Sequence, residues 1–283
     1  MKKITIQTQD HYPIAAHYFE SKTLSEKCIV ISTGVGMPQR FFFNFAQWLA
    51  TQGFHTYTYD YRGIALSKPK TLKGMKASYY EWTNQDFTGV SLYVRKAHPK
   101  AQMYHIGHSF GGNSLGMSTA YTNYEKFLGV GSQYGYYRNF PLKMKVIIVL
   151  GFGVLSPLLS SLLGYFPSPW IGLGEPLPKK VMSDWGVFLL KKGAMLSLAN
   201  DYNENHYDKI TKPMLLISID DDNFAPKKAV DVLANKVYAN AAVERLHLVP
   251  KEYGIKRLGH NNFFRKKNKN NLWPIVLDWF NPN

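Results

Sequence analysis

Ser109 lies in the stretch Gly-His-Ser-Phe-Gly at residues 107–111, where its surroundings favour covalent chemistry. The apolar run QMYHI precedes this stretch and a run rich in small residues follows it, so the pattern predicts a strand, a tight turn and a helix. A serine on such a turn exposes its hydroxyl, and glycines two residues before and after it let the strand and the helix approach each other. We therefore predict that Ser109 is a nucleophile; the alternative is an ordinary glycine-rich turn.

An activated serine needs two partners, and the spacing of the sequence can locate them. A base must remove the hydroxyl proton, and a carboxylate must orient that base. For a serine on a strand-to-helix turn, the acid and then the histidine follow in chain order, each after a late strand. Asp220, Asp221 and Asp222 follow the apolar run PMLLISI, and His260 follows a glycine in a loop after the last predicted strand. These residues are the candidates; turn-capping carboxylates and a surface-loop histidine are the alternatives.

Attack by a serine also places negative charge on the substrate oxygen, which two backbone N–H groups must stabilise. The residue after the nucleophile, Phe110, supplies one of them. The turn TGVG at residues 33–36, after the predicted strand CIVIST, would supply the other. We favour Val35 as the donor there, with Gly34 and Gly36 as alternatives. Glycines that simply permit a tight turn would explain the same pattern.

Two further patterns suggest a metal site, but neither has the geometry that a metal site requires. His105 and His108 lie three residues apart in a predicted strand, so their side chains point to opposite faces of the sheet. We expect both to pack or to shape the turn. The aspartates do not form a calcium loop, because the position counted from Asp220 that requires glycine is Ala225. The sequence therefore predicts no metal and no cofactor.

The scaffold that positions these residues is an alternation of strand and helix patterns. Strands are predicted at residues 3–8, 14–19, 28–33, 54–59, 101–106, 127–132, 213–219 and 244–249, and helices at 40–50, 84–98, 109–121, about 230–237 and 271–280. The first two strands flank turn residues and form a hairpin. The remaining alternation predicts an α/β fold, with a mostly parallel central sheet covered by helices on both faces.

Composition limits the compartment and the partners. The chain has 283 residues, a single cysteine (Cys28) and no apolar leader at its start, so we expect no internal disulfide and a cytoplasmic protein. A net charge of +15, from 34 basic and 19 acidic residues, attracts polyanions in general. We find no nucleic-acid-binding motif and expect no specific nucleic-acid partner. The basic run at 263–271 is expected to be a solvated loop, with contact to an acidic surface as the alternative. The oligomeric state is left open.

Five motifs together resemble the α/β-hydrolase superfamily across nearly the whole chain. In chain order they are TGVG followed by PQRFF, YDYRG, GHSFGG, DDDNFAP and RLGHNNFFR. The resemblance is to predicted bacterial hydrolases without assigned substrates, and more distantly to serine aminopeptidases and monoacylglycerol lipases. It implies the α/β-hydrolase fold and the site residues Ser109, Asp222, His260, Phe110 and Val35.

The resemblance also selects among the aspartates and marks two departures. Asp222 stands four residues before Pro226, which is similar to the loop of many hydrolases whose acid faces the histidine, so it is favoured over Asp221. Many relatives have His-Gly where this chain has Thr33-Gly34. Ala65 takes the place of the second glycine in a DxRGxG loop.

The long interruption between two predicted strands resembles a helical cap over the nucleophile. We expect the cap to span residues 133–205, with residues 1–132 and 206–283 forming the core. Eight aromatic residues lie in it, and some should wall the substrate pocket: Tyr134, Tyr136, Tyr137, Phe140, Tyr165, Phe166, Trp170 and Trp185.

The uncharged stretch from Val146 to Gly174 is long enough to suggest a membrane span. A single crossing would put Ser109 and the acid–histidine pair on opposite sides of the membrane. Three glycines and Pro157 also predict a poor continuous helix. We therefore expect a buried or pocket-lining cap, with weak contact to an anionic membrane surface and a true span as the alternatives.

Two classes of function follow from these residues. The first is a serine hydrolase that works through an acyl-enzyme, acting on a small-molecule carboxylic ester with an apolar or aromatic acyl group; peptidase and thioesterase activity remain open. The second is a non-catalytic binding protein of the same fold. An intact serine, aspartate and histidine in the required order favour the enzyme.

Overall fold

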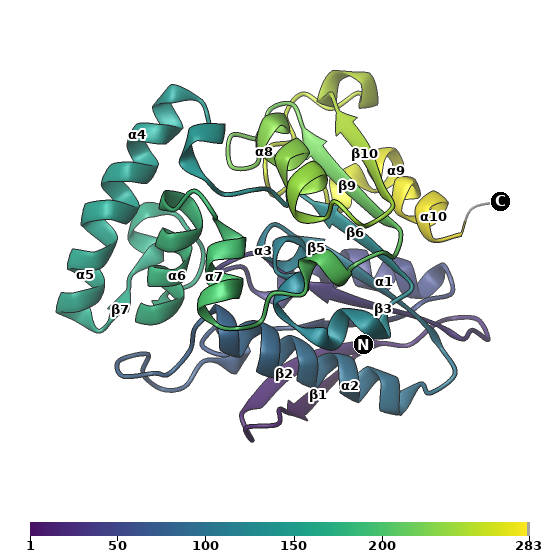
Figure 1. Cartoon of the computed structure of the whole chain (residues 1–283). Coiled ribbons are helices and arrows are strands. Elements are labelled where there is room, and N and C mark those ends of the chain that lie inside the picture. The colour runs from purple at the N-terminus through teal and green to yellow at the C-terminus, as the bar shows by residue number, and fades with distance from the viewer. Residues whose placement is uncertain (282–283) are drawn as a thin grey trace.

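An eight-stranded sheet forms the centre of the protein, as the computed structural model of residues 1–281 shows (Figure 1). The strands are β1 (Lys2–Gln7), β2 (Pro13–Phe19), β3 (Lys27–Ser32), β4 (His55–Tyr59), β5 (Gln102–His108), β6 (Lys126–Val130), β9 (Met214–Ile219) and β10 (Val243–Leu248). Their order in the sheet is β1-β2-β4-β3-β5-β6-β9-β10. The pairs β1–β2 and β2–β4 are antiparallel and the others are parallel, which confirms the hairpin and the mostly parallel sheet.

Helices cover both faces of this sheet. One face carries α1 (Phe43–Thr51), α9 (Lys269–Leu272) and α10 (Pro274–Phe280); the other carries α2 (Thr88–Ala97), α3 (Phe110–Asn113) and α8 (Lys227–Val232). Side chains of β3 alternate between the two cores: Cys28 and Val30 lie in one, Ile29 and Ile31 in the other. Because the parallel strands all end at one edge, the loops after β3, β5, β9 and β10 meet there.

The helix predicted at residues 109–121 is much shorter than expected. It ends at Asn113, and the chain continues as 3-10 turns at Leu115–Met117 and Thr119–Asn123. Two tyrosine hydroxyls explain the break: Tyr238 donates to the Gly112 carbonyl and Tyr207 to the Asn113 carbonyl, each at 2.6 Å. These carbonyls would otherwise accept the next helical hydrogen bonds. Distant residues therefore override the local pattern.

The segment between β6 and β9 is largely helical. It holds α4 (Leu142–Leu150), a π-helical segment (Gly151–Leu155), α5 (Ser156–Leu163), the short strands β7 (Tyr165–Phe166) and β8 (Leu177–Pro178), and the helices α6 (Lys179–Leu190) and α7 (Met195–Asp201). The first three form one helix of 22 residues, Leu142–Leu163, which we call the cap helix. Figure 1 shows it along the outer edge of the molecule, beside α6.

The continuity of the cap helix contradicts the expectation that Gly151, Gly153 and Pro157 would break it. The π-helical turns lie immediately before Pro157, and their wider spacing accommodates a residue that has no N–H to donate. Gly164 then ends the helix in the left-handed conformation, with φ 79°. Gly151 and Gly153, by contrast, lie within the π-helical segment and do not end the helix.

Buried polar contacts fix the inserted segment onto the core. Asp184 of α6 accepts a hydrogen bond from the backbone N–H of Tyr79 in the core at 2.9 Å, and within the segment it accepts one from the Tyr202 hydroxyl at 2.8 Å. At another point the Glu175 N–H donates to the Gly36 carbonyl at 2.8 Å. The second contact ties the segment directly to the turn after β3.

Candidate active site

Ser109 occupies the turn between β5 and α3 with a backbone conformation that is rare outside glycine, φ 50° and ψ −115°. The two flanking glycines are required by space. A Cβ on Gly107 would lie 2.3 Å from the Gly112 nitrogen, and one on Gly111 would lie 2.3 Å from the Ser32 carbonyl oxygen. The strand and the helix therefore approach as closely as the sequence pattern predicts.

Hydrogen bonds hold this strained residue from both sides. The Ser109 N–H donates to the Val130 carbonyl, and the Ser132 hydroxyl donates to the Ser109 carbonyl, both at 3.0 Å. The same carbonyl accepts from the backbone N–H groups of Gly112 and Asn113, again at 3.0 Å. A conformation of this kind costs about 1–3 kcal/mol and persists only where its surroundings determine it fully.

Asp222 and His260 meet although they lie in different loops. The His260 Nδ1–H donates to Asp222 Oδ2 at 2.7 Å, which leaves Nε2 free to take a proton. The other carboxylate oxygen accepts from the backbone N–H groups of Phe224 at 2.8 Å and Ala225 at 3.0 Å. Burial alone would raise the pKa of the Asp222 carboxyl, but His260 and these donors bring it below its ordinary value. The carboxylate is therefore charged and oriented toward the imidazole.

Asp221 has a different place from its neighbour. Its carboxylate accepts hydrogen bonds from the backbone N–H groups of Leu258 at 2.9 Å and Gly259 at 2.7 Å, the two residues before His260. It therefore holds the histidine loop and does not contact the imidazole. The resemblance favoured Asp222 over Asp221 as the acid, but no sequence signal indicated that Asp221 holds the loop. Asp220 is exposed, and its carboxylate lies 3.5 Å from the His247 ring.

His108, one residue before the serine, packs against His260. Its ring lies 4.8 Å from the His260 ring, and its Nε2 lies 3.0 Å from the His260 carbonyl oxygen. Burial, with a contribution from His260, lowers the pKa of His108 to about 3, so the ring is neutral and its Nε2–H donates to that carbonyl. His105 packs on the other side of the sheet, against Phe87 and Tyr124. The two histidines lie on opposite faces, as predicted.

Ser109 and His260 line the same cavity but are not bonded to each other. Within residues 1–281, no hydrogen bond joins the serine hydroxyl to the imidazole. Such bonds are often long in enzymes without substrate and shorten when it binds. The described chain thus contains the acid–histidine pair and places Ser109 at the same cavity, but it contains no hydrogen bond between the serine and the histidine.

The two expected oxyanion donors also border this cavity. Val35, Phe110 and Ser109 are among its lining residues. In the part of the chain that the structure describes, the backbone N–H groups of Val35 and Phe110 make no hydrogen bond. A Cβ on Gly34 would lie 3.3 Å from the Ser109 Cβ and 3.0 Å from the His108 Nδ1, so the turn after β3 is packed against the serine. Two backbone N–H groups without a partner in the described chain thus belong to residues that line the cavity.

The cavity measures about 670 Å³ and is mainly apolar. The inserted segment supplies much of its wall, including Phe140, Ile148, Phe152, Trp185 and Phe188. Phe140 and Trp185 were among the aromatic residues predicted from the sequence. The polar residues Asn113, Gln133 and Asn261 were not, and nothing in the local pattern marked them. No lining residue in the described chain carries a carboxylate.

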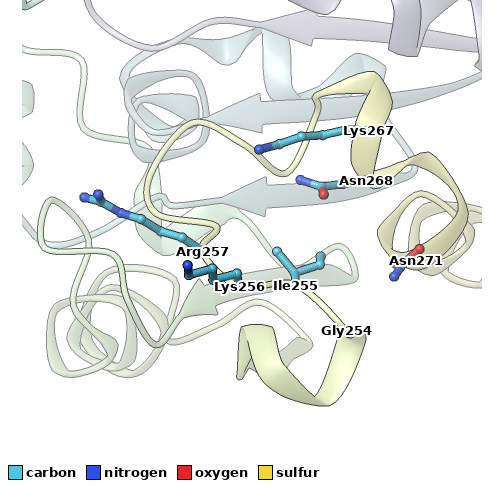
Figure 2. Close-up of a pocket in the computed structure, with 7 residues that line it drawn as sticks. All are labelled: Gly254, Ile255, Lys256, Arg257, Lys267, Asn268 and Asn271. Atoms are coloured by element: carbon cyan, nitrogen blue, oxygen red, sulfur yellow. The ribbon is translucent and has the colours of Figure 1, made fainter.

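A second hollow, of about 500 Å³, lies away from this site (Figure 2). Exposed Lys256, Arg257 and Lys267 line it, together with Gly254, Ile255, Asn268 and Asn271. It contains neither a nucleophile nor a base beside a carboxylate. The basic side chains of the run at 263–271 are exposed, but the run is not the loop that was expected, because it forms a 3-10 turn at Lys266–Asn268 and α9 at Lys269–Leu272. Within residues 1–281, no group of three or more His, Cys, Asp or Glu side chains could hold a metal ion.

Comparison with known proteins identifies the fold of the chain. Residues 24–129 match the family model described as serine aminopeptidase, S33. No curated protein matches the sequence. An esterase from Pyrococcus furiosus superposes with a TM-score of 0.64 at 14% identity, covering 99% of this chain and 89% of that one. The chain has the α/β-hydrolase fold.

Two other structures with the α/β-hydrolase fold are similar over nearly their whole length. A soluble variant of monoglyceride lipase from Saccharomyces cerevisiae, solved with a substrate analogue, gives a TM-score of 0.65 at 13% identity, covering 99% of this chain and 95% of that one. Est1E from Butyrivibrio proteoclasticus, solved with ferulic acid, gives 0.59 at 16% identity, covering 98% and 99%. The resemblance that the sequence motifs indicate is therefore confirmed at the level of the α/β-hydrolase fold.

Proposed function

We propose that this protein is a serine hydrolase that cleaves carboxylic esters with an apolar acyl group through an acyl-enzyme. The observation that carries the proposal is the bond of 2.7 Å between Asp222 and His260, made at the wall of the cavity that Ser109 also lines. A buried, charged carboxylate on Nδ1 keeps Nε2 as the proton acceptor. The elbow conformation of Ser109 presents its hydroxyl to the same space.

The reaction would proceed in two halves. The Ser109 Oγ attacks the ester carbonyl carbon while its proton passes to the His260 Nε2, and the carbonyl oxygen takes the negative charge. The N–H groups of Val35 and Phe110 stabilise that oxygen. When the tetrahedral intermediate collapses, the alkoxide leaves with the proton from His260. A water molecule then repeats the sequence on the acyl-enzyme, releases the acid and restores Ser109.

The cavity wall favours an ester over the amino-terminal peptide bond that the family description suggests. A substrate with a free amino terminus carries a positive charge, which needs a carboxylate partner when it is buried. The described lining residues include no aspartate or glutamate. A volume of about 670 Å³ with aromatic walls suits an uncharged acyl chain or ring instead.

Labelling with a fluorophosphonate tests the nucleophile directly. Wild type should react, and Ser109→Ala should not. Ser114→Ala is the matched control, because it makes the same substitution one turn further along at a buried serine that does not line the cavity. Equal labelling of wild type and Ser109→Ala would rule out the proposed nucleophile.

A series of p-nitrophenyl esters of increasing chain length tests the substrate class. We expect kcat/KM to rise from acetate to chains of medium length, as the acyl group fills the apolar cavity. Aminoacyl p-nitroanilides should be poor substrates. A preference for acetate over all longer chains, or for the anilides over the esters, would contradict an ester hydrolase with an acyl pocket.

A further inference from the structure

Six apolar side chains form a continuous exposed row along the cap helix. They are spaced four residues apart, and each is more than half exposed: Leu142, Val146, Leu150, Val154, Leu158 and Leu162. Residues four apart are neighbours on the surface of a helix, so the six form one continuous row that winds along it. We call these six residues the apolar row.

The apolar row is unusual for a surface in water. The cap helix has 22 residues, which gives it a length of about 33 Å, and only 17% of its most apolar 18-residue window is buried. By length and composition it could cross a membrane. Large exposed apolar patches of this kind mark sites of interaction. Figure 1 shows the helix at the edge of the molecule, with α6 on its inner side.

The charges around the apolar row have one sign. Residues 126–174 contain no aspartate or glutamate, and Arg138, Lys143 and Lys145 lie at or just before the start of the cap helix. These cations complement an anionic lipid surface. A second copy of the chain would bring the same positive charges together across the contact. The charge pattern therefore favours a membrane over self-association.

The opposite side of the cap helix belongs to the candidate active site. Ile148 and Phe152 line the cavity that contains Ser109, so the helix cannot leave the protein to span a bilayer without opening this wall. Ile171 and Phe224 line the same cavity and are 51% and 43% exposed, which places apolar side chains at its mouth. The helix that bears the apolar row thus also forms the edge of the cavity.

Trp170 adds an aromatic side chain beside this mouth. It precedes Ile171 and is 69% exposed. Tryptophan prefers the boundary between water and the lipid interior, because its ring is apolar and its N–H can remain hydrated. A membrane contact would explain why so large a side chain is left uncovered here.

We propose that the apolar row is a membrane-docking surface, which seats the protein on an anionic phospholipid bilayer with the cavity mouth facing the lipid. The row enters the boundary between head groups and acyl chains without crossing it, as interfacial helices do. Arg138, Lys143 and Lys145 contact the lipid phosphates. A substrate ester dissolved in the membrane could then reach the cavity without passing through water. The docking itself is independent of the proposed hydrolase activity.

Flotation with phospholipid vesicles tests the proposal. Wild type and Ser109→Ala should both bind vesicles that contain phosphatidylglycerol, and both should bind pure phosphatidylcholine less well. The triple variant V146S/L150S/V154S should bind at least tenfold more weakly. The triple variant L24S/L66S/L92S is the matched control, because it removes three exposed apolar side chains outside the cap and should bind like wild type. Circular dichroism checks that each variant is folded.

The charged groups are tested separately. The variant K143Q/K145Q should lose its preference for phosphatidylglycerol, whereas K96Q/K100Q, which removes two lysines of α2 and the loop after it, should retain it. Because binding is measured without substrate, failure of the esterase assays would not affect this result, and failure of binding would not affect the proposed nucleophile.

Four outcomes would overturn the proposal. The two triple variants could bind equally, which would mean that net charge alone drives the contact. Wild type could fail to bind either kind of vesicle. Wild type could be a dimer that V146S/L150S/V154S converts to a monomer, in which case a second copy covers the row. Bound protein could resist an alkaline carbonate wash, which would indicate a span.

Discussion

The turn that carries Ser109 and the cap helix are both built from small and apolar residues, yet they are constrained very differently. At the turn, four hydrogen bonds and two glycines without space for a Cβ determine the position of one side chain. On the cap helix, a Cβ on Gly151 would meet nothing within 4 Å, and the apolar row faces outward. The chemistry needs an atom fixed in place, whereas a docking surface needs only an uncovered apolar face.

A substitution in the acid–histidine pair should have the largest effect on catalytic activity. Asp222→Asn keeps the shape of the side chain but favours the wrong tautomer of His260, so we expect kcat for a soluble p-nitrophenyl ester to fall about 10³–10⁴-fold. Asp221→Asn, the same change one residue earlier, weakens only the loop contact and should cost about tenfold. Leu150→Asn on the apolar row should change kcat less than twofold. The comparison fails if Leu150→Asn costs as much as Asp222→Asn.

Glycine substitutions extend the contrast to stability. Gly111→Ala forces a Cβ to 2.3 Å from a backbone oxygen, so we expect the free energy of unfolding to fall by at least about 3 kcal/mol. Gly151→Ala fills open space on a helix and should raise it by about 0.5–1 kcal/mol. Urea denaturation of both variants measures the difference. Equal effects would show that the turn is less tightly packed than its contacts indicate.

The sequence predicted the constrained region better than the exposed one. The glycines around Ser109 and the loop of His260 are local signals, because each follows from the space or spacing that one turn requires, whereas the choice of Asp222 over Asp221 rested on the resemblance. The end of α3 at Asn113 is not local, since hydroxyls of Tyr207 and Tyr238 far along the chain cause it. A pattern of apolar residues around 109–121 cannot reveal such partners.

The cap helix shows a different limit of sequence reasoning. Glycine and proline predicted a break between Val146 and Gly174, but the π-helical turns at Gly151–Leu155 absorb both. Ala65 departs from the glycine of the DxRGxG loop, and it adopts a positive φ of 40°. Glycine adopts this conformation most readily, so the departure marks a real constraint on the backbone. Which apolar residues face outward could not be predicted, because the stretch is apolar on every side.

Low pH should destabilise the folded protein through two buried histidines of β5, His105 and His108. It should leave the proposed membrane contact of the apolar row unchanged. Burial lowers the pKa values of His105 and His108 to about 3, whereas in the unfolded chain both titrate near 6.5. As the pH falls, the unfolded state therefore binds protons that the folded state excludes, and stability is lost below pH 6.5. For two histidines the free energy of unfolding should fall by about 3 kcal/mol between pH 7.5 and 5.5.

Denaturation curves at several pH values measure this loss, and His105→Gln should remove about half of it. Residues 146–163 carry no titratable side chain, so the part of vesicle binding that V146S/L150S/V154S removes should be the same at both pH values. A stability that does not change over this range would mean that the histidines are protonated in the folded protein.

The smallest effect concerns backbone strain, which the Ser109 turn shares with a turn elsewhere in the inserted segment. Ser109 and Ala194, the residue before α7, have nearly the same conformation, with φ 50° and ψ −115° for the first and φ 46° and ψ −122° for the second. Glycine relieves this strain, so Ser109→Gly should be more stable than Ser109→Ala by about 1 kcal/mol. Ala194→Gly should gain about 0.5 kcal/mol, because it also loses a buried methyl group. If Ser109→Gly were instead the less stable of the two serine variants, the hydrogen bonds around the turn would be stabilising a relaxed backbone, and the contrast with the cap would rest on packing alone.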